Sequence, residues 1–371
     1  MLTPRLTTAL AGIVLLLSCT EGLAADRIIT DALNRQVQVP EKVERVICSG
    51  SGCLRLLTYL QAQDKIVAVD DIEKRRRRLD ARPYALANPQ FKTYPIFGEF
   101  RGHDHPEQIL TLDPQPQVIL KTLSAMGHDP VELQNKTGIP VVVLNYGDLG
   151  RYRKQFYQAL QIMGAVVHRT PRAEAVIRFF DAQIAELASR TASIAEVRKP
   201  TCFVGGIAFK GPHGFQSTEP GYPPFAFIGA NNLAQDDTAS SHALRHSNIA
   251  KEQILKWDPQ YLFLDLSSLQ MGNKAGGLYE LKTDPAYRSL TAVQQGRVYG
   301  LLPYNWYTGN FGSILADAFY LGKCLYPDHF KAVDPVAKAD AIYRFLVGKA
   351  VFRQMDEAFG NMVFKKIPVN E

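Results

Sequence analysis

The nine residues EQILTLDPQ, from Glu107 to Gln115, recur almost unchanged as EQILKWDPQ, from Glu252 to Gln260. The copies are identical at seven of nine positions, and the two differences are adjacent. An Ile-Leu pair, an Asp-Pro step and a following apolar run predict a short helix, a turn and a buried strand. Proline disfavours helix at the preceding residue, so each helix must end by its Asp. One supersecondary unit is therefore built twice, unless two ordinary helix-to-strand junctions converged on the same turn chemistry.

Helix and strand patterns alternate around both copies. The first is followed by a helical segment over 130–138 and an apolar strand over 139–146. The second follows a strand over 201–209 and precedes a helix, a Gly turn and a strand over 290–302. This alternation predicts an α/β fold with parallel-rich sheets. We expect two Rossmann-like lobes, 26–165 and 199–371, with a ligand cleft between them and a single linking helix within 166–198.

The linking helix is predicted from a long segment, 170–197, that has no internal Gly and no Pro after its first turn. Thr170 is its candidate N-cap and Pro171 its first helical residue. At 1.5 Å per residue the helix is roughly 40 Å long. A helix of that length acts as a strut and limits how far the lobes can close.

The first 25 residues have the pattern of a signal peptide: a basic residue, a short apolar core and a polar end with small residues. Cleavage after Ala24 or Ala25 would release the protein into the periplasm. The segment LLSC, ending at Cys19, is also similar to a lipoprotein box, so a lipid anchor through Cys19 stays open.

The composition is typical of a globular protein and argues against a disordered chain. Of the 371 residues, 46% are hydrophobic and 21% charged, and the formal net charge of +6 favours an anionic ligand. Four cysteines remain after residue 25, and they are too scattered for a zinc site. Cys48 and Cys53 could form a disulfide or stay as free buried thiols.

Three polar segments of the N-terminal half are candidate ligand contacts. The turn SGSG, from Ser49 to Gly52, can present backbone amides to an anion at a helix start, but it matches no nucleotide-binding pattern. The arginines 75–78 are either a solvated face or an electropositive rim. His103, Asp104 and His105 have metal-ligand side chains, although their spacing also suits turn and capping roles.

In the C-terminal half, a long loop rich in Gly, Pro and aromatics follows the strand at 201–209, and the segment PYNWYTGN follows another strand. Open α/β sheets bind ligands at the ends of their strands and in the loops beyond them. The predicted ligand-binding residues are Ser49, Gly50, Arg101, Tyr146, Phe209, Lys210, Tyr222, Trp306 and Tyr307.

Several of these segments together resemble the class III substrate-binding proteins of ABC importers for iron siderophores, cobalamin and haem. They are DALNRQVQVPEKVERVIC, the two repeats, the long helix, LTAVQQGRVYGLLPYNW and ADAFYLGKCLYPDHF, and they span essentially the whole chain after residue 25. The later segments are especially similar to members for iron complexes or for molybdate and tungstate.

This resemblance implies a monomeric periplasmic protein without a cofactor. It would capture a metal chelate, above all a ferric siderophore, and deliver it to a permease in the inner membrane. Family members dock through one surface glutamate per lobe, and Glu107 and Glu252 match those positions. The alternatives are a bare oxyanion, held by Ser49, Ser51, arginines and backbone amides, or cobalamin or haem. An exported metalloenzyme using His103 to His105 lacks a third ligand and a nucleophile with its base. We expect neither catalysis nor nucleic-acid binding.

Overall fold

The structure is a computed structural model that describes residues 26–75, 78–123, 127–235 and 246–369. The predicted signal peptide, the alternative anchor at Cys19, and Arg76 and Arg77 lie outside the described residues.

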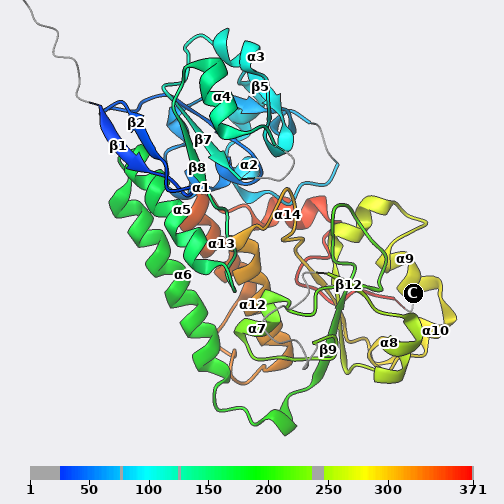
Figure 1. Cartoon of the computed structure of the whole chain (residues 1–371). Coiled ribbons are helices and arrows are strands. Elements are labelled where there is room, and N and C mark those ends of the chain that lie inside the picture. The colour runs from blue at the N-terminus through cyan, green and yellow to red at the C-terminus, as the bar shows by residue number, and fades with distance from the viewer. Residues whose placement is uncertain (1–25, 76–77, 124–126, 236–245, 370–371) are drawn as a thin grey trace, which may run out of the picture.

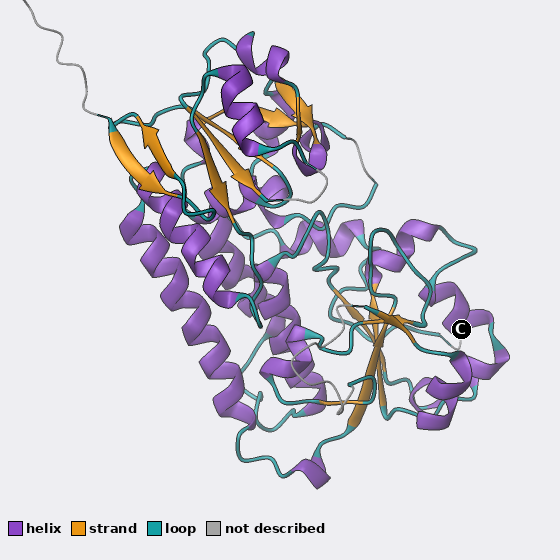
Figure 2. Cartoon of the chain, in the orientation of Figure 1, coloured by secondary structure: helices purple, strands orange, loops and turns teal. Residues whose placement is uncertain are grey.

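Two sheets, one in each half of the chain, form the framework (Figures 1 and 2). The first has six strands in the order β6-β5-β4-β3-β7-β8, and all neighbours are parallel except β5 and β6. The second has four parallel strands in the order β11-β9-β13-β14. The predicted α/β class is therefore confirmed. The strands are β3 (Val46–Ser49), β4 (Ile66–Asp70), β5 (Ile96–Glu99), β6 (His103–Asp104), β7 (Val118–Thr122), β8 (Val141–Leu144), β9 (Thr201–Gly205), β11 (Asn231–Asn232), β13 (Tyr261–Asp265) and β14 (Val298–Leu301).

The two copies of the repeat occupy corresponding places in the two sheets. Helix α3 (Pro106–Leu110) leads into β7, which lies between β3 and β8. Helix α8 (Lys251–Trp257) leads into β13, which lies between β9 and β14. Ile109 and Ile254, the same residue of each copy, are both fully buried. The repeated sequence thus encodes one helix that anchors through its Ile and one strand inserted between two others.

Helix α6 (Thr170–Thr191) runs past both sheets along one edge of the molecule (Figure 1), beside α5 (Arg153–Val166). It starts where predicted, but Arg169 holds the N-cap position and Thr170 is already helical, so the predicted N-cap is wrong by one residue. It also ends at Thr191, earlier than the predicted 197. The Thr191 hydroxyl bonds to the carbonyls of Leu187 and Ala188, and a separate 3-10 helix spans Glu196–Arg198.

The C-terminal helices α12 (Phe311–Leu325), α13 (Pro335–Val347) and α14 (Phe352–Ala358) also bridge the halves. Helix α13 packs on α1 (Cys53–Tyr59) and α2 (Pro83–Ala87), so a single hydrophobic core contains residues of both sheets. Arg172 of α6 donates to the carbonyl oxygens of Tyr59 and Phe345. Helix α6 is therefore not the only connection that limits movement of the lobes.

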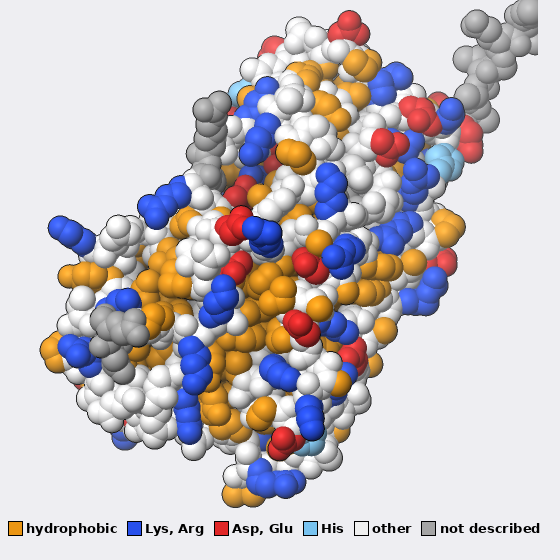
Figure 3. Space-filling model, turned by 180° about the vertical axis from the view of Figure 1, so that it is seen from behind, with side chains coloured by type: hydrophobic (Ala, Val, Ile, Leu, Met, Phe, Trp, Pro, Cys, Tyr) orange, Lys and Arg blue, Asp and Glu red, His pale blue; other side chains and the backbone are white. Residues whose placement is uncertain are grey.

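The remaining features are peripheral. Strands β1 (Arg27–Thr30) and β2 (Gln36–Val39) form an antiparallel hairpin. On the rear face, Lys and Arg are interspersed with Asp and Glu around a central band of hydrophobic side chains (Figure 3). Within the described residues, no helix combines the length and the apolarity that crossing a membrane requires.

Candidate functional site

Two adjoining cavities, of about 290 and about 1010 Å³, open between the two halves of the chain. Each of their shared lining residues follows the carboxyl end of a strand, where open α/β sheets bind ligands. Both halves of the chain contribute, so a ligand held there would touch both. The shared residues are Ser51, Arg101, Lys210, Asn305 and Thr308.

Four lining residues have backbone conformations that non-glycine residues rarely adopt. The φ angles are 67° at Arg101, 57° at Lys210, 50° at Tyr307 and 63° at Thr308. Left-handed conformations cost about 1 kcal/mol or more each and collect at functional sites, where the surrounding structure holds them. Their gathering around one hollow marks it as the candidate site.

The two cations shared by both cavities come from opposite halves. Arg101 follows β5 and its guanidinium lies 5.0 Å from the ring centroid of Phe100, and the guanidinium of Arg75 lies 4.4 Å from the same ring. Lys210 follows β9 and its ammonium lies over Phe209 at 5.5 Å. Arg75 also pairs with Asp71 at 2.5 Å, so within the arginine run it supports the lining residue Phe100 and does not itself line the cavities.

The wall formed by residues 304–310 is fixed by a buried arginine from the other half. Arg55 of α1 donates to the carbonyls of Gly309 at 3.0 Å, Trp306 at 3.2 Å and Tyr307 at 3.1 Å. It also donates to the hydroxyl of Tyr146 at 2.5 Å, and that hydroxyl donates to the carbonyl of Gly309 at 2.7 Å. Three carbonyl oxygens, the Tyr146 hydroxyl and the rings of Tyr84 and Tyr146 therefore surround this buried charge.

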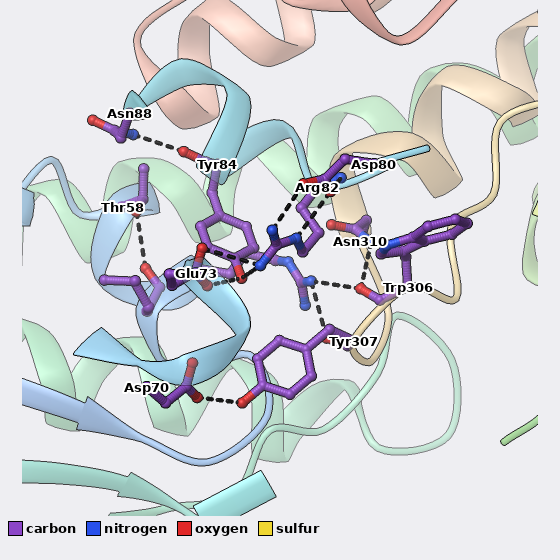
Figure 4. A network of polar contacts seen from close by, with 12 residues as sticks. Thr58, Asp70, Glu73, Asp80, Arg82, Tyr84, Asn88, Trp306, Tyr307 and Asn310 are labelled. Atoms are coloured by element: carbon purple, nitrogen blue, oxygen red, sulfur yellow. Dashed lines mark hydrogen bonds and ion pairs between the residues drawn. The ribbon is translucent and has the colours of Figure 1, made fainter. Parts of the chain in front are cut away.

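A second inter-lobe contact joins Tyr307 to Asp70 at the end of β4 (Figure 4). The Tyr307 hydroxyl accepts from the backbone N–H of Arg101 at 3.2 Å, so the aromatic wall and the cation share one network. Burial, followed by the nearby charge of Glu73, raises the pKa of Asp70 to about 8. Burial, followed by Asp70, also raises the pKa of Tyr307.

Behind this contact, Figure 4 shows a buried ion-pair network on the N-terminal side. Arg82 bonds to Glu73 at 3.0 Å and to Asp80 at 2.8 Å, and the Tyr84 hydroxyl donates to Glu73 at 2.6 Å. Burial nevertheless raises the pKa of Glu73. The network holds the segment that follows β4 and supports Asp70.

Six predicted site residues are brought together around the cavities: Arg101, Tyr146, Phe209, Lys210, Trp306 and Tyr307. Three others line neither cavity. The Ser49 hydroxyl accepts from the buried ammonium of Lys121 at 3.0 Å. A Cβ at Gly50 would lie 2.6 Å from Thr122 Oγ1, which shows how closely the turn is packed there. The Tyr222 ring is 1% exposed and packs on Phe225 and Tyr304.

Arg55, Asp70, Asn305 and Thr308 are site features that the sequence reading missed. Arg55 had a usable signal, because it is the only charge in the apolar segment CLRLLTY. A charge in a buried helix must find polar partners. Its partners lie 251 to 254 residues away in the sequence, so the local sequence pattern could not predict them.

The other sequence candidates have structural surroundings of their own. Cys48 and Cys53 are free buried thiols. Asp104 is buried and pairs with Lys121 at 2.5 Å, while His103 lies against His128. Across the described residues, no group of three or more His, Cys, Asp or Glu side chains could hold a metal. Glu107 and Glu252 are exposed in the first turns of α3 and α8, and neither lines a cavity.

The chain is similar in sequence to known proteins. A family model described as periplasmic binding protein matches residues 46–304. The molybdate-binding protein MolA of Haemophilus influenzae is 21% identical over 341 residues, covering 86% of this chain and 90% of that protein.

Solved structures show the same fold. MolA bound to molybdate has a TM-score of 0.64 at 19% identity, over 88% of this chain and 99% of MolA. A periplasmic solute binding protein from Veillonella parvula has a TM-score of 0.67 at 16% identity, over 91% and 97%. The haem-binding protein HutB of Vibrio cholerae has a TM-score of 0.54 at 21% identity, over 76% and 99%.

Proposed function

The chain belongs to the periplasmic binding protein family, whose members bind solutes for ABC transporters, and we propose that it captures an anionic metal chelate between its two lobes. The observation that carries the proposal is the pair of adjoining cavities with Arg101 and Lys210 on opposite sides. A ligand bridging the two cations would engage both halves at once.

The size of the hollow favours a chelate over a small ion. Sites for organic ligands typically enclose about 300 to 1,000 Å³, and the larger cavity alone reaches about 1010 Å³. Its lining includes Tyr146, Tyr152, Phe209, Tyr304 and Phe311, which suits the flat organic surface of a chelator. Iron complexes, ferric siderophores first, are the class to test, and HutB shows that this fold accommodates an iron complex.

A bare oxyanion is the second candidate. The smaller cavity, about 290 Å³, is lined by Ser51, Arg101, Lys210, Asn305 and Thr308, which supply several donors to an anion. The name and bound ligand of MolA favour the same reading. Molybdate therefore belongs in the same panel as the chelates.

We further propose that the ligand is passed to an inner-membrane permease through Glu107 and Glu252, and that the protein works in the periplasm. The family assignment supports a permease partner and an extracytoplasmic location. Mass spectrometry of the mature N-terminus distinguishes release by cleavage after residue 24 or 25 from anchoring through Cys19.

The test is a binding titration of the purified protein with ferric catecholate and hydroxamate complexes, haem, cobalamin, molybdate and tungstate. We expect an anionic iron complex to bind, and Arg101→Ala and Lys210→Ala each to weaken binding by about 10- to 100-fold, the worth of a charge-assisted hydrogen bond. Lys349→Ala, an exposed lysine outside the lining, is the matched control. Tight binding of molybdate, together with no binding of any chelate, would mean that the ligand is an oxyanion and not a chelate.

A further inference from the structure

Two histidines lie together behind the wall of the larger cavity. His213 belongs to the loop after β9, and His246 directly precedes β12 (Ser247–Asn248), which pairs with β10 (Ser217–Thr218). Their ring centroids are 5.3 Å apart and the rings are inclined by 39°. The His246 ring also stacks on Phe209 at 4.6 Å. His246 is therefore held beside β12 and against the cavity-lining ring of Phe209, and His213 lies in the loop that leads into β10.

The hydrogen bonds place a proton on Nε2 of both rings. His213 Nε2 lies 2.7 Å from the carbonyl oxygen of Phe209, which can only accept, so Nε2 carries the proton. The Ser217 hydroxyl donates its one proton to the carbonyl of Ile207 at 2.6 Å. It must then accept from His246 Nε2 at 2.9 Å. Both rings keep a lone pair on Nδ1, and within the described residues neither Nδ1 has a hydrogen-bond partner.

These are the conditions under which histidine binds a metal. The neutral imidazole is the ligand form, and a second-shell acceptor on the other nitrogen orients it. Two imidazoles on one tetrahedral ion, with metal–nitrogen lengths of about 2.0 Å, place their centroids roughly 5 Å apart, the separation seen here.

We propose that His213 and His246 form a two-histidine site for a late first-row divalent cation, bound through both Nδ1 atoms. Imidazole suits Cu²⁺, Ni²⁺ and Zn²⁺, whereas Mn²⁺ prefers oxygen ligands. The remaining coordination positions are open to water. The site lies beside the ligand cavity and requires no particular ligand there.

The test uses the whole mature chain without a polyhistidine tag and the metal salt alone. We expect one Cu²⁺ ion per chain by calorimetry at pH 7.5, weaker Ni²⁺ and Zn²⁺ binding, and negligible Mn²⁺ binding. His213→Ala and His246→Ala should each weaken Cu²⁺ binding at least roughly tenfold, and Ser217→Ala roughly 10- to 100-fold by releasing the ring of His246. His329→Ala, an exposed histidine elsewhere, should bind as the parent does.

A spectroscopic readout keeps the proposal testable if a variant folds poorly. The Cu²⁺ electron paramagnetic resonance spectrum of the parent protein should show two equatorial nitrogens. One nitrogen, none, or Cu²⁺ affinity unchanged in both histidine variants would overturn the site. Because only metal salts are added, this outcome is independent of whether a chelate binds in the cavities.

Discussion

The hydroxyl of Tyr307 donates a 2.5 Å hydrogen bond to Oδ2 of Asp70, across the boundary between the two halves of the chain. The same hydroxyl accepts from the backbone N–H of Arg101. A cavity-wall ring, a buried carboxyl group and a candidate ligand-binding cation are thus one unit. Changing the carboxyl should alter both the stability of the protein and its dependence on pH.

Asp70→Asn tests this coupling. The folded pKa of Asp70, about 8, lies above its ordinary value of 3.8, so the folded state binds the proton more tightly. Its contribution to stability is then full below about pH 4 and is lost as pH rises through about 8. Asparagine cannot ionise and still accepts from Tyr307. Between pH 5 and 8 the free energy of unfolding in urea should fall less steeply in the variant, by up to about 1 kcal/mol per pH unit.

The exposed Asp328 supplies the control, because Asp328→Asn should keep the parental pH slope. Asp265, whose pKa burial raises to about 7, stays in both proteins, so the difference in slope reports Asp70 together with Glu73 and Tyr307, the groups coupled to it. Parallel slopes for parent and Asp70→Asn would mean that this carboxyl is not protonated preferentially in the fold.

Arg55→Met should loosen the cavity wall. The change removes three bonds from a charged donor, and the carbonyl of Tyr307 loses the one donor described for it, whereas Tyr146 still donates to Gly309 and Asn310 to Trp306. A hydrogen bond to a charged group contributes about 1.5 to 3 kcal/mol and an unpaired buried acceptor costs about 1 to 3 kcal/mol before relaxation, so we expect the free energy of unfolding to fall by about 3 kcal/mol. Urea denaturation measures it. Arg353→Ala, whose side chain is 89% exposed, should change stability by less than about 0.5 kcal/mol; an equal loss in both variants contradicts the role of Arg55.

The repeat shows how much of the fold can be predicted from local sequence. Its Asp-Pro steps and its buried Ile residues were enough to predict two like helix-to-strand units, because both signals act within a few residues. Arg101, Lys210 and Trp306 were also predictable as lining residues, since each follows a strand. Ser49 follows the same rule but lines neither cavity, because its hydroxyl bonds to Lys121, 72 residues away. Partners at that distance also explain why Arg55 was missed.

Trp306→Phe tests the position of the binding site. The chain has two tryptophans, and Trp257 lies in α8, outside the cavity lining. Trp306 lines the smaller cavity and is 5% exposed. A ligand there should quench the parent fluorescence, and Trp306→Phe should remove most of the ligand-dependent change while Trp257→Phe keeps it. Quenching and affinity that survive Trp306→Phe would put the ligand elsewhere.

The double variant Glu107→Ala, Glu252→Ala tests permease docking. Both carboxylates are exposed in the first turn of the repeated helix, and Figure 1 places α3 and α8 in different lobes, both away from α6. An exposed ion pair contributes only about 0 to 1 kcal/mol, so stability and ligand affinity should not change. Paired anchors at an interface instead govern association and its salt dependence. Uptake into vesicles with the reconstituted permease should slow, and added salt should matter less than it does for the parent.

Glu132→Ala is the matched control for that experiment. Glu132 is an exposed carboxylate on α4 (Pro130–Thr137), the helix that packs beside α3, and it pairs with Lys136 at 2.6 Å. Its removal takes away a nearby negative charge and leaves in place Glu107, which interacts with the same Lys136, so uptake should stay at the parental rate. If the double variant also transports normally, the repeated glutamate is only a residue that suits the positive end of two short helices. If Glu132→Ala slows uptake equally, local charge near α3, and not the repeated position, governs docking.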